Sequence, residues 1–334
     1  MSLHTLLAEL RRRDIRVRAD GERLMVNAPP GALVPELQEQ LRRQKQEVLQ
    51  FLRTADELTK QHWAIVPLQP CGPRPPIFGV PGGNGDVFCF LYLAGRLGTD
   101  QPLYGLQPPG LDGRSEPLNH IEELAAYFVR QIAAFYPEGP LVVTGFCAGG
   151  MTAFEVGRLL ARQRRNVAVV LLGAPHPTTY RRLAIAPALM QEQWARFARW
   201  MTTHRRTLAS LSTRDKWSYI TERLRRQTKR SGASTAPDPV LALRAKVEFA
   251  ALAGARRYTP GQFDGRLSIF VPSRASAQNR EKQLRWRSAA PECLVFFGPD
   301  GCTRDEMLHE PYVGSFADQL RACASEAVPD PAAV

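Results

Sequence analysis

The sequence predicts an α/β fold with a mainly parallel sheet, preceded by a small unit that mixes helices with a hairpin. Between residues 76 and 323, short apolar runs alternate with stretches of helical period, which is the order of strands joined by crossover helices. The pattern of residues 1–54 instead predicts a helix, a hairpin and further helices. A chain of 334 residues accommodates one large domain and a small appendage.

The N-terminal unit has its own apolar pattern. Leucines recur at helical spacing near its start, at Leu3, Leu6, Leu7 and Leu10. Residues 15–18 and 24–26 alternate like strands around an Ala-Asp-Gly-Glu turn at 19–22, and a charged helix starts at Pro35. A unit of this size buries little surface, so we expect it to dimerise or to pack on a partner.

The larger unit, over residues 76–327, follows a polar connection over 55–75. We expect strands over 76–81, 103–106, 141–145, 167–172, 267–271 and 294–297, and helices over 88–97, 121–135, 151–163 and 313–323. A helical insertion interrupts this alternation after 177, and the stretch 231–239 is expected to be a loop.

Basic residues are concentrated in this insertion. The net charge of the chain is +12, and residues 179–230 hold 13 Arg or Lys against Glu192, Asp215 and Glu222. The segment is either a solvated helical surface or a face that attracts an acidic macromolecule. Neither a zinc finger nor an RNA-recognition signature accompanies it, so nucleic acid is the weaker candidate.

Cysteine usage and hydropathy argue against several classes of protein. The six cysteines form no Cys-x-x-Cys pairs, so we predict neither a metal site nor a disulfide framework. No apolar run approaches the roughly 20 residues of a membrane span, and arginines follow the apolar N-terminal residues, the reverse of a secretory signal. We therefore expect a soluble, cytoplasmic protein that contacts no membrane.

The stretch "VVTGFCAGGM" at 142–151 is typical of a nucleophile elbow in which cysteine replaces serine. Cys147 lies between Gly145 and Gly149, after an apolar strand and before a helix. The alternative is a buried structural cysteine. In the loop "VPGGNG" at 80–85, the N–H of Gly82 would form an oxyanion hole with the N–H of Ala148, unless the loop is simply a tight turn.

Two segments resemble known families. The stretches "PPIFGVPGGNGDVFCFLYLAGRLGTDQPLYGLQPPGLDG", "ARRYTPGQFDGRLSIFVPS" and "EMLHEPYVGSFADQL", with the elbow, resemble the thioesterase domain that ends nonribosomal peptide and polyketide assembly lines. "LLAELRRRDIRVRADGERLMVNAPPGALVPELQEQLRRQKQEVLQFL" resembles the N-terminal docking domain of the tubulysin-synthetase (TubC) type, expected over 1–54.

These resemblances imply a fold, a substrate and partners. The first implies an α/β-hydrolase fold with a helical lid over about 177–247, no bound cofactor, and an acyl chain presented as a thioester on the phosphopantetheine of a carrier protein. Carrier proteins are acidic, which gives the basic insertion a candidate partner. The second implies a homodimer whose hairpin binds the C-terminal tail of an upstream synthetase subunit by strand addition.

The catalytic residues of the thioesterase family do not all match. Gly173 stands where the family has its aspartate, and Arg304 stands where it has its histidine. A thiol at a helix N-terminus needs less activation than a hydroxyl, and a cation such as Arg304 would favour thiolate. The candidate base is His176 in preference to His309, and the third alternative is that neither histidine serves.

The resemblance therefore implies a terminal release enzyme. It would take the chain onto Cys147 and discharge it by cyclisation or transfer to an amine or carbon nucleophile, since cysteine variants of the family are associated with strained-ring and carbon–carbon closure. The alternatives are a degenerate docking scaffold and a proofreading hydrolase. The separate patterning of residues 1–54 predicts that the docking unit serves addressing and is dispensable for the chemistry.

Overall fold

The computed structural model describes residues 1–326 except 14, 30, 182–238 and 275–276. Its described part contains a seven-stranded sheet in the order β3-β5-β4-β6-β7-β8-β9. The strands are β3 (Ile65–Gln69), β4 (Ile77–Val80), β5 (Leu103–Leu106), β6 (Leu141–Phe146), β7 (Val167–Leu172), β8 (Arg266–Val271) and β9 (Cys293–Phe297). Only the β3–β5 pair among them is antiparallel, so the prediction of a mainly parallel sheet is confirmed.

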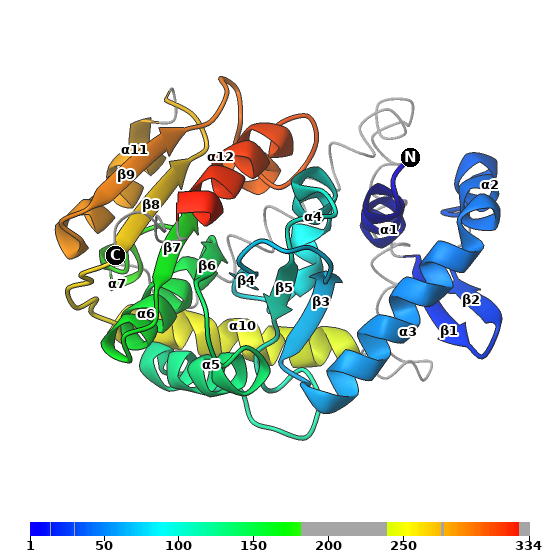
Figure 1. Ribbon diagram of the computed structural model, residues 1–334, viewed down its shortest axis with the longest axis horizontal. Coiled ribbons are helices and arrows are strands. Elements are labelled where there is room, and N and C mark those ends of the chain that lie inside the picture. Colours follow the sequence, from blue (N-terminus) through cyan, green and yellow to red (C-terminus); the bar gives the residue numbers. More distant parts are fainter. Residues whose placement is uncertain (14, 30, 182–238, 275–276, 327–334) are drawn as a thin grey trace, which may run out of the picture.

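Helices cover both faces of the sheet, as Figure 1 shows. On one face lie α4 (Leu91–Leu97) and α12 (Val313–Glu326); on the other lie α5 (Ile121–Phe135), α6 (Gly149–Arg162) and α10 (Pro239–Arg257). Alternate residues of β6 separate accordingly, since Val142 packs with the α4 and α12 layer and Val143 with the α5 and α6 layer. Burial on both faces explains why the central strands read as continuous apolar runs.

The strand order places a crevice near the centre of the sheet. The chain passes from β4 to β5 on one side and then returns to β6 on the other side of β4. In open α/β sheets, ligands bind at the carboxyl ends of the strands where the order reverses in this way. The turn after β6, which carries Cys147, and the loop after β4 both lie at this point.

The N-terminal unit comprises α1 (Leu3–Arg12), β1 (Arg16–Asp20), β2 (Arg23–Asn27), α2 (Pro35–Arg43) and α3 (Lys45–Gln61). The two strands form an antiparallel hairpin with Val17 opposite Val26. Ser2 caps α1 by accepting a hydrogen bond from the N–H of Thr5, and Pro35 occupies the first turn of α2. The expected helix, hairpin and helices are therefore all present.

The structure differs from the sequence expectation over residues 55–75. Helix α3 continues to Gln61, and β3 forms the antiparallel edge of the main sheet. Pro67 conceals this strand in the sequence, because a proline normally argues against a strand and is tolerated mainly at a sheet edge. The stretch is thus built into the fold rather than serving as a polar linker.

The N-terminal unit packs directly on the larger one. Helix α1 lies against α4, and α3 lies against β3. Leu6 and Leu10 of α1 belong to the same buried cluster as Leu93 and Leu97 of α4. The ring of His4 makes a 2.9 Å hydrogen bond between Nε2 and the carbonyl of Leu68. The sequence predicts the N-terminal unit as a separate appendage. It does not predict the core that this unit shares with the larger one, because that core is formed by contacts between residues far apart in the chain.

The insertion expected over 177–247 is described at its two ends. Helix α7 (Thr178–Arg181) begins it, and α10 extends past the expected end to Arg257. Residues 182–238, which carry Arg196, Arg199, Arg205 and Arg206, lie outside the described residues. Among the described helices, none is both long and apolar enough to cross a membrane.

Candidate active site

Cys147 occupies a sharp turn between the end of β6 and the start of α6. Its φ is +52°, a conformation that residues other than glycine adopt rarely and that is characteristic of strained functional turns. The N–H of Cys147 donates to the carbonyl of Leu172 at 3.0 Å, and its own carbonyl accepts from the N–H of Gly150 at 3.1 Å. The turn is therefore anchored to β7 on one side and to its own helix on the other.

Gly149 allows the elbow to approach the loop after β4. A Cβ atom at this position would fall against the carbonyl oxygen of Pro81 and within 2.7 Å of that of Val80. Only glycine permits this contact, because any side chain would push the helix away from β4. The same approach brings Gly83 beside Ala148, whose Cβ lies 3.8 Å from the position of a Cβ on Gly83.

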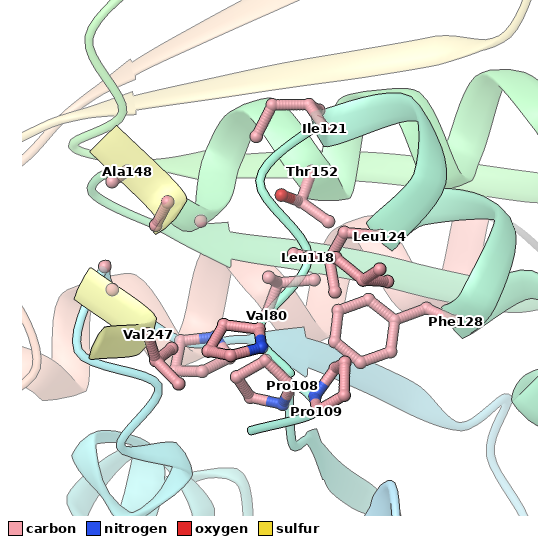
Figure 2. A pocket seen from close by; sticks show the side chains of 16 residues that line it. Val80, Pro108, Pro109, Leu118, Ile121, Leu124, Phe128, Ala148, Thr152 and Val247 are labelled. Carbon is pink, nitrogen blue, oxygen red and sulfur yellow. The ribbon is translucent and has the colours of Figure 1, made fainter. Parts of the chain in front are cut away.

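A pocket opens between the elbow and the β4 loop. Its empty space is about 470 Å³ including the mouth, and Gly82, Gly83, Ala148 and Gly149 form part of its wall. The remaining lining is almost wholly apolar and comes from the end of β4, the loops after β4 and β5, and α5, α6 and α10: Val80, Pro81, Pro108, Pro109, Pro117, Leu118, Ile121, Leu124, Phe128, Thr152, Val247 and Ala251. Figure 2 shows Ala148 on one side of this space and Phe128 on the opposite side.

This lining determines what the pocket can hold. The hydroxyl of Thr152 is the polar side-chain group among these lining residues. A pocket of that kind accommodates an apolar acyl chain with its carbonyl near the elbow. Ala148 and Gly82 both border this pocket beside the elbow. Burial raises the pKa of the Cys89 thiol, whereas a backbone hydrogen bond from Gly82 to that thiol lowers it.

Arg304 lies against Gly173 at the end of β7. A Cβ atom on Gly173 would be 2.8 Å from Cγ of Arg304 and 2.8 Å from the sulfur of Met307. Gly173 also has a φ of +58°. The aliphatic stem of Arg304 therefore fills the space that a side chain at 173 would need, and the two departures from the family pattern are sterically linked.

We expect Gly173→Ala to destabilise the fold by about 2–4 kcal/mol, because it adds a left-handed backbone penalty to overpacking against Arg304. Thermal unfolding measures this loss. Gly314→Ala is the matched control, since Gly314 lies in α12 with no atom within 4 Å of the added methyl. We expect that control to be neutral or slightly stabilising; equal losses in both variants would contradict the steric link.

Electrostatic coupling joins Arg304 to the cysteine. The negative charge of a Cys147 thiolate is the largest influence on the pKa of Arg304, which it raises. Burial, followed by the same thiolate charge, raises the pKa of Tyr180 in α7 far above its ordinary value, while Arg304 lowers it. The structure thus brings Cys147, Arg304 and Tyr180 together, and Tyr180 stays protonated.

Cys89 is a second thiol near the elbow. Burial raises its pKa well above the ordinary value, and the charges of Asp86 and Cys147 raise it further. Cys89 therefore remains a neutral thiol when Cys147 is ionised. Cys89 and Tyr180 therefore add no negative charge near Cys147, whereas Arg304 adds a positive one.

The two candidate histidines lie in different places. His176 follows β7 and is buried; its Nδ1 lies 3.1 Å from the hydroxyl of Thr178, and its ring meets Trp286 edge-on at 5.0 Å between centroids. His309 lies in the turn before α12 and packs edge-on against Tyr92 of α4, with the charge of Arg12 lowering its pKa after the larger effect of burial. His309 thus faces the N-terminal unit.

Sequence patterns miss two residues of this region. Tyr180 has no motif to mark it, because its relation to Cys147 depends on the fold of the chain after β7. Asp86 follows the glycine loop and reads as an ordinary turn residue, although it contacts three elements. Tyr180 is distinguished by its burial and Asp86 by its ion pairs, and neither property can be recognised from the neighbouring residues in the sequence.

A parallel sheet, a strained elbow after a central strand and a pocket at the topological switch point define an α/β hydrolase. The profile of the thioesterase domain family matches residues 75–290, and the chain belongs to that family. The profile of the TubC N-terminal docking domain matches residues 3–54. Both resemblances expected from the sequence are confirmed.

Solved structures share this fold. The Vlm2 thioesterase domain bound with a dodecadepsipeptide aligns with a TM-score of 0.56 and 19% identity, over 78% of this chain and 98% of that one. The NocB thioesterase domain from the nocardicin cluster aligns with a TM-score of 0.52 and 18% identity, over 76% of this chain and 95% of that one. At these identities the similarity establishes the fold.

Curated relatives are much longer proteins. Malpinin synthetase of Mortierella alpina is 34% identical over 134 residues, which is 40% of this chain and 2% of that protein. The dimodular nonribosomal peptide synthase of Bacillus subtilis (strain 168) is 30% identical over 123 residues, 37% of this chain and 5% of that protein. Polyketide synthase PksR of the same strain is 35% identical over 113 residues, 34% of this chain and 4% of that protein.

Proposed function

We propose that this protein is a chain-releasing acyl transferase of a nonribosomal peptide or hybrid polyketide assembly line. It takes an acyl or peptidyl chain from the phosphopantetheine of a carrier protein onto Sγ of Cys147 and discharges it to an amine or carbon nucleophile. The observation that carries this proposal is the position of Cys147, at a strained elbow beside an apolar pocket. Membership of the thioesterase family supports the reaction class.

Acylation exchanges one thioester for another. The Cys147 thiolate attacks the carbonyl carbon of the incoming thioester, and the oxyanion that forms accepts hydrogen bonds from the N–H groups of Ala148 and Gly82. Collapse of this intermediate breaks the bond to the pantetheine sulfur, which leaves as thiolate and takes a proton from water. The chain stays activated, because the product on Cys147 is again a thioester.

Arg304 replaces the usual general base in this proposal. A cation that a thiolate stabilises in turn stabilises the thiolate, so the raised pKa of Arg304 implies that Cys147 ionises more readily beside it. The N-terminus of α6, which begins two residues later at Gly149, adds a positive partial charge. Cys147 then needs no histidine to remove its proton before attack.

Discharge requires a nucleophile of the substrate itself. With Gly173 and Arg304 in place of the acid and the base, no carboxylate–histidine pair at these positions orients a water. The pocket lining is almost wholly apolar, which disfavours water further. An amine of the bound chain attacks the thioester directly, or a carbanion adjacent to a carbonyl does so, and the Cys147 thiolate is the leaving group in both cases.

His176 remains our proposed base for the incoming nucleophile. It is buried four residues after the end of β7, whereas His309 packs against Tyr92 in the direction of the N-terminal unit. The ring of His176 is held by Thr178 and Trp286, which would fix its orientation. This assignment rests on position, and Cys147 acylation does not depend on it.

The docking unit supports a place in an assembly line. The TubC N-terminal docking domain match covers residues 3–54, and Met25 and Val26 of β2 are exposed on its hairpin. We propose that this hairpin binds the C-terminal tail of an upstream synthetase subunit by strand addition, and that the unit dimerises. The carrier domain of that subunit would then deliver the chain.

Intact-mass spectrometry with carrier-free acyl-pantetheine thioesters tests the proposed function. We expect a stable adduct whose mass equals the acyl group, located on Cys147 by peptide mapping and blocked by prior alkylation. The released product should be an amide or a cyclised chain. No adduct with any of several acyl groups would instead favour a docking scaffold, and release of the linear acid alone would favour a hydrolase.

The role of Arg304 predicts the pH dependence of Cys147 alkylation. We expect Arg304→Met to raise the pH midpoint of alkylation by about one unit and to slow the reaction at pH 7 about tenfold, because the thiolate loses its cation. Arg304→Lys should retain most of the rate. Arg162→Met is the control, since Arg162 is an exposed cation in the last turn of the same helix α6. An unchanged midpoint in Arg304→Met would remove Arg304 from the mechanism.

A further inference from the structure

Asp86 closes the loop that carries Gly82. We call residues 81–85 the oxyanion loop; it connects β4 to the short helix η1 (Val87–Phe90). The carboxylate of Asp86 caps η1 by accepting a hydrogen bond from the N–H of Phe88 at 3.3 Å. The N–H of Asp86 donates to Oδ1 of Asn84 at 3.1 Å. The end of the loop is therefore held by Asp86 itself.

The same carboxylate reaches the N-terminal unit. Nη2 of Arg11, in the last turn of α1, lies 3.4 Å from Oδ1 and 3.3 Å from Oδ2 of Asp86. The Arg11 guanidinium also lies over the ring of Phe88, 5.1 Å from its centroid. Through Arg11, helix α1 thus contacts both Asp86, which caps η1, and Phe88, which lies within η1. The contact spans 75 positions of the sequence.

Asp86 reaches the pocket wall as well. Nη1 of Arg244 in α10 lies 3.3 Å from Oδ2 of Asp86. The far end of α10 is fixed separately, because the hydroxyl of Tyr258 donates to Glu155 of α6 at 2.8 Å. Val247, one turn after Arg244, lines the pocket and would be 3.3 Å from a Cβ on Gly85. The Arg244–Asp86 pair therefore holds the other half of α10 against the oxyanion loop.

We propose that Asp86 is a positioning residue that holds the oxyanion loop beside the elbow by binding Arg11 of α1 and Arg244 of α10 at the same time. The inference rests on the proposed function, because the oxyanion loop matters only if Cys147 is acylated. The three side chains are partly shielded, with 35% of Arg11, 26% of Arg244 and 20% of Asp86 exposed. The docking unit is on this reasoning part of the catalytic body.

The chemistry explains why the carboxylate is needed. Nη2 of Arg11 and Nη1 of Arg244 each lie 3.3 Å from Oδ2 of Asp86. Without the negative charge, two neighbouring cations would therefore lose the group that neutralises them both, and like charges close together repel. An amide oxygen at position 86 could still cap η1, so the loss falls on the ion pairs with Arg11 and Arg244. The loop that carries Gly82 would then be held less firmly beside the elbow. Small displacements of groups that stabilise a transition state lower rates steeply.

Two rates measured on the full-length protein distinguish misplacement of the oxyanion loop from a general distortion of the site around Cys147. The first is acylation of Cys147 by a carrier-free acyl-pantetheine thioester, which forms an oxyanion. The second is alkylation of Cys147 by iodoacetamide, which forms none. We expect Asp86→Asn, Arg11→Gln and Arg244→Gln each to slow acylation. The largest effect should be that of Asp86→Asn, at about tenfold. This is smaller than the roughly 10²–10³-fold loss of rate that follows removal of an oxyanion-hole donor. Alkylation should stay within about twofold.

Matched controls come from the same helix. Arg13 follows α1 and pairs with Glu9 four residues earlier, so Arg13→Gln removes a similar charge from α1 without touching the loop. We expect it to leave both rates unchanged. In the double variant of Arg11→Gln with Asp86→Asn, the loss of acylation should be smaller than the product of the single losses, because the two residues share one contact. Independent losses that multiply would overturn the assignment.

Hydrogen exchange distinguishes this inference from the proposed function. Amides of residues 81–90 should exchange about two- to fivefold faster in Asp86→Asn and Arg11→Gln than in wild type and Arg13→Gln, whether or not Cys147 is acylated. Wild type without an adduct but with these exchange differences would overturn the proposed function alone. Unchanged exchange, or acylation and alkylation falling together, would overturn the role of Asp86.

Discussion

Replacing Cys147 by alanine is expected to abolish the covalent adduct and to lower chain release by between about 10³- and 10⁶-fold, the range for removal of a catalytic nucleophile. The reason is that position 147 lies at the strained turn beside the pocket that Ala148 and Gly149 border, and an alanine there has no nucleophilic sulfur to accept the acyl group. Release measured by mass spectrometry with a carrier-bound chain checks this. The exposed Cys71 supplies the control, since Cys71→Ala should behave as wild type.

Cys147→Ser extends the same prediction to the environment of the elbow. A serine hydroxyl must lose its proton during attack, and Gly173 and Arg304 provide neither the acid nor the base of the family. We expect Cys147→Ser to be acylated at least about 10²-fold more slowly than wild type. A serine variant that is acylated as fast as wild type would mean that a general base acts on residue 147. The proposal that Arg304 makes such a base unnecessary would then be wrong.

Removing residues 1–60 is expected to destabilise the α/β domain strongly. Leu68 of β3 and Leu93 and Leu97 of α4 are fully buried in the cluster that includes Leu6 and Leu10 of α1. Each such side chain that becomes exposed costs about 1.5–3 kcal/mol, so three together amount to several kcal/mol. For a domain of this size, we expect the midpoint of thermal unfolding to fall by about 10 °C or more.

Point changes keep this prediction interpretable if the shortened chain fails to fold. Leu10→Ala, at 1% exposure, should cost about 2–5 kcal/mol in the full-length protein. Met25→Ala on the hairpin, where Met25 is 41% exposed, should cost little. A shortened protein that unfolds at the wild-type temperature would contradict this prediction and would support the expectation from the sequence that the docking unit is dispensable for the chemistry.

Local patterns alone predicted most of the secondary structure of the larger unit. The expected strands at 103–106 and 167–172 and the expected helix at 121–135 agree residue by residue with β5, β7 and α5. They agree because a parallel strand buried on both faces is a short apolar run, and an amphipathic helix repeats its apolar face every turn. The frame of the elbow is equally local, since Gly145, Cys147 and Gly149 lie within a single strand–turn–helix.

Tertiary structure decided the features that depend on residues far apart in the chain. Strand β3 exists because β5 pairs with it at a sheet edge that tolerates Pro67, and no local pattern contains that pairing. Arg304 is 131 positions from Gly173 in sequence yet occupies the space beside it, which places a cation rather than a histidine near Cys147. The docking helix reaches the oxyanion loop through Arg11 and Asp86 in the same way. Composition and periodicity report the environment of each residue along its own helix or strand, whereas these contacts are fixed by how the layers pack, and packing is a property of the whole chain.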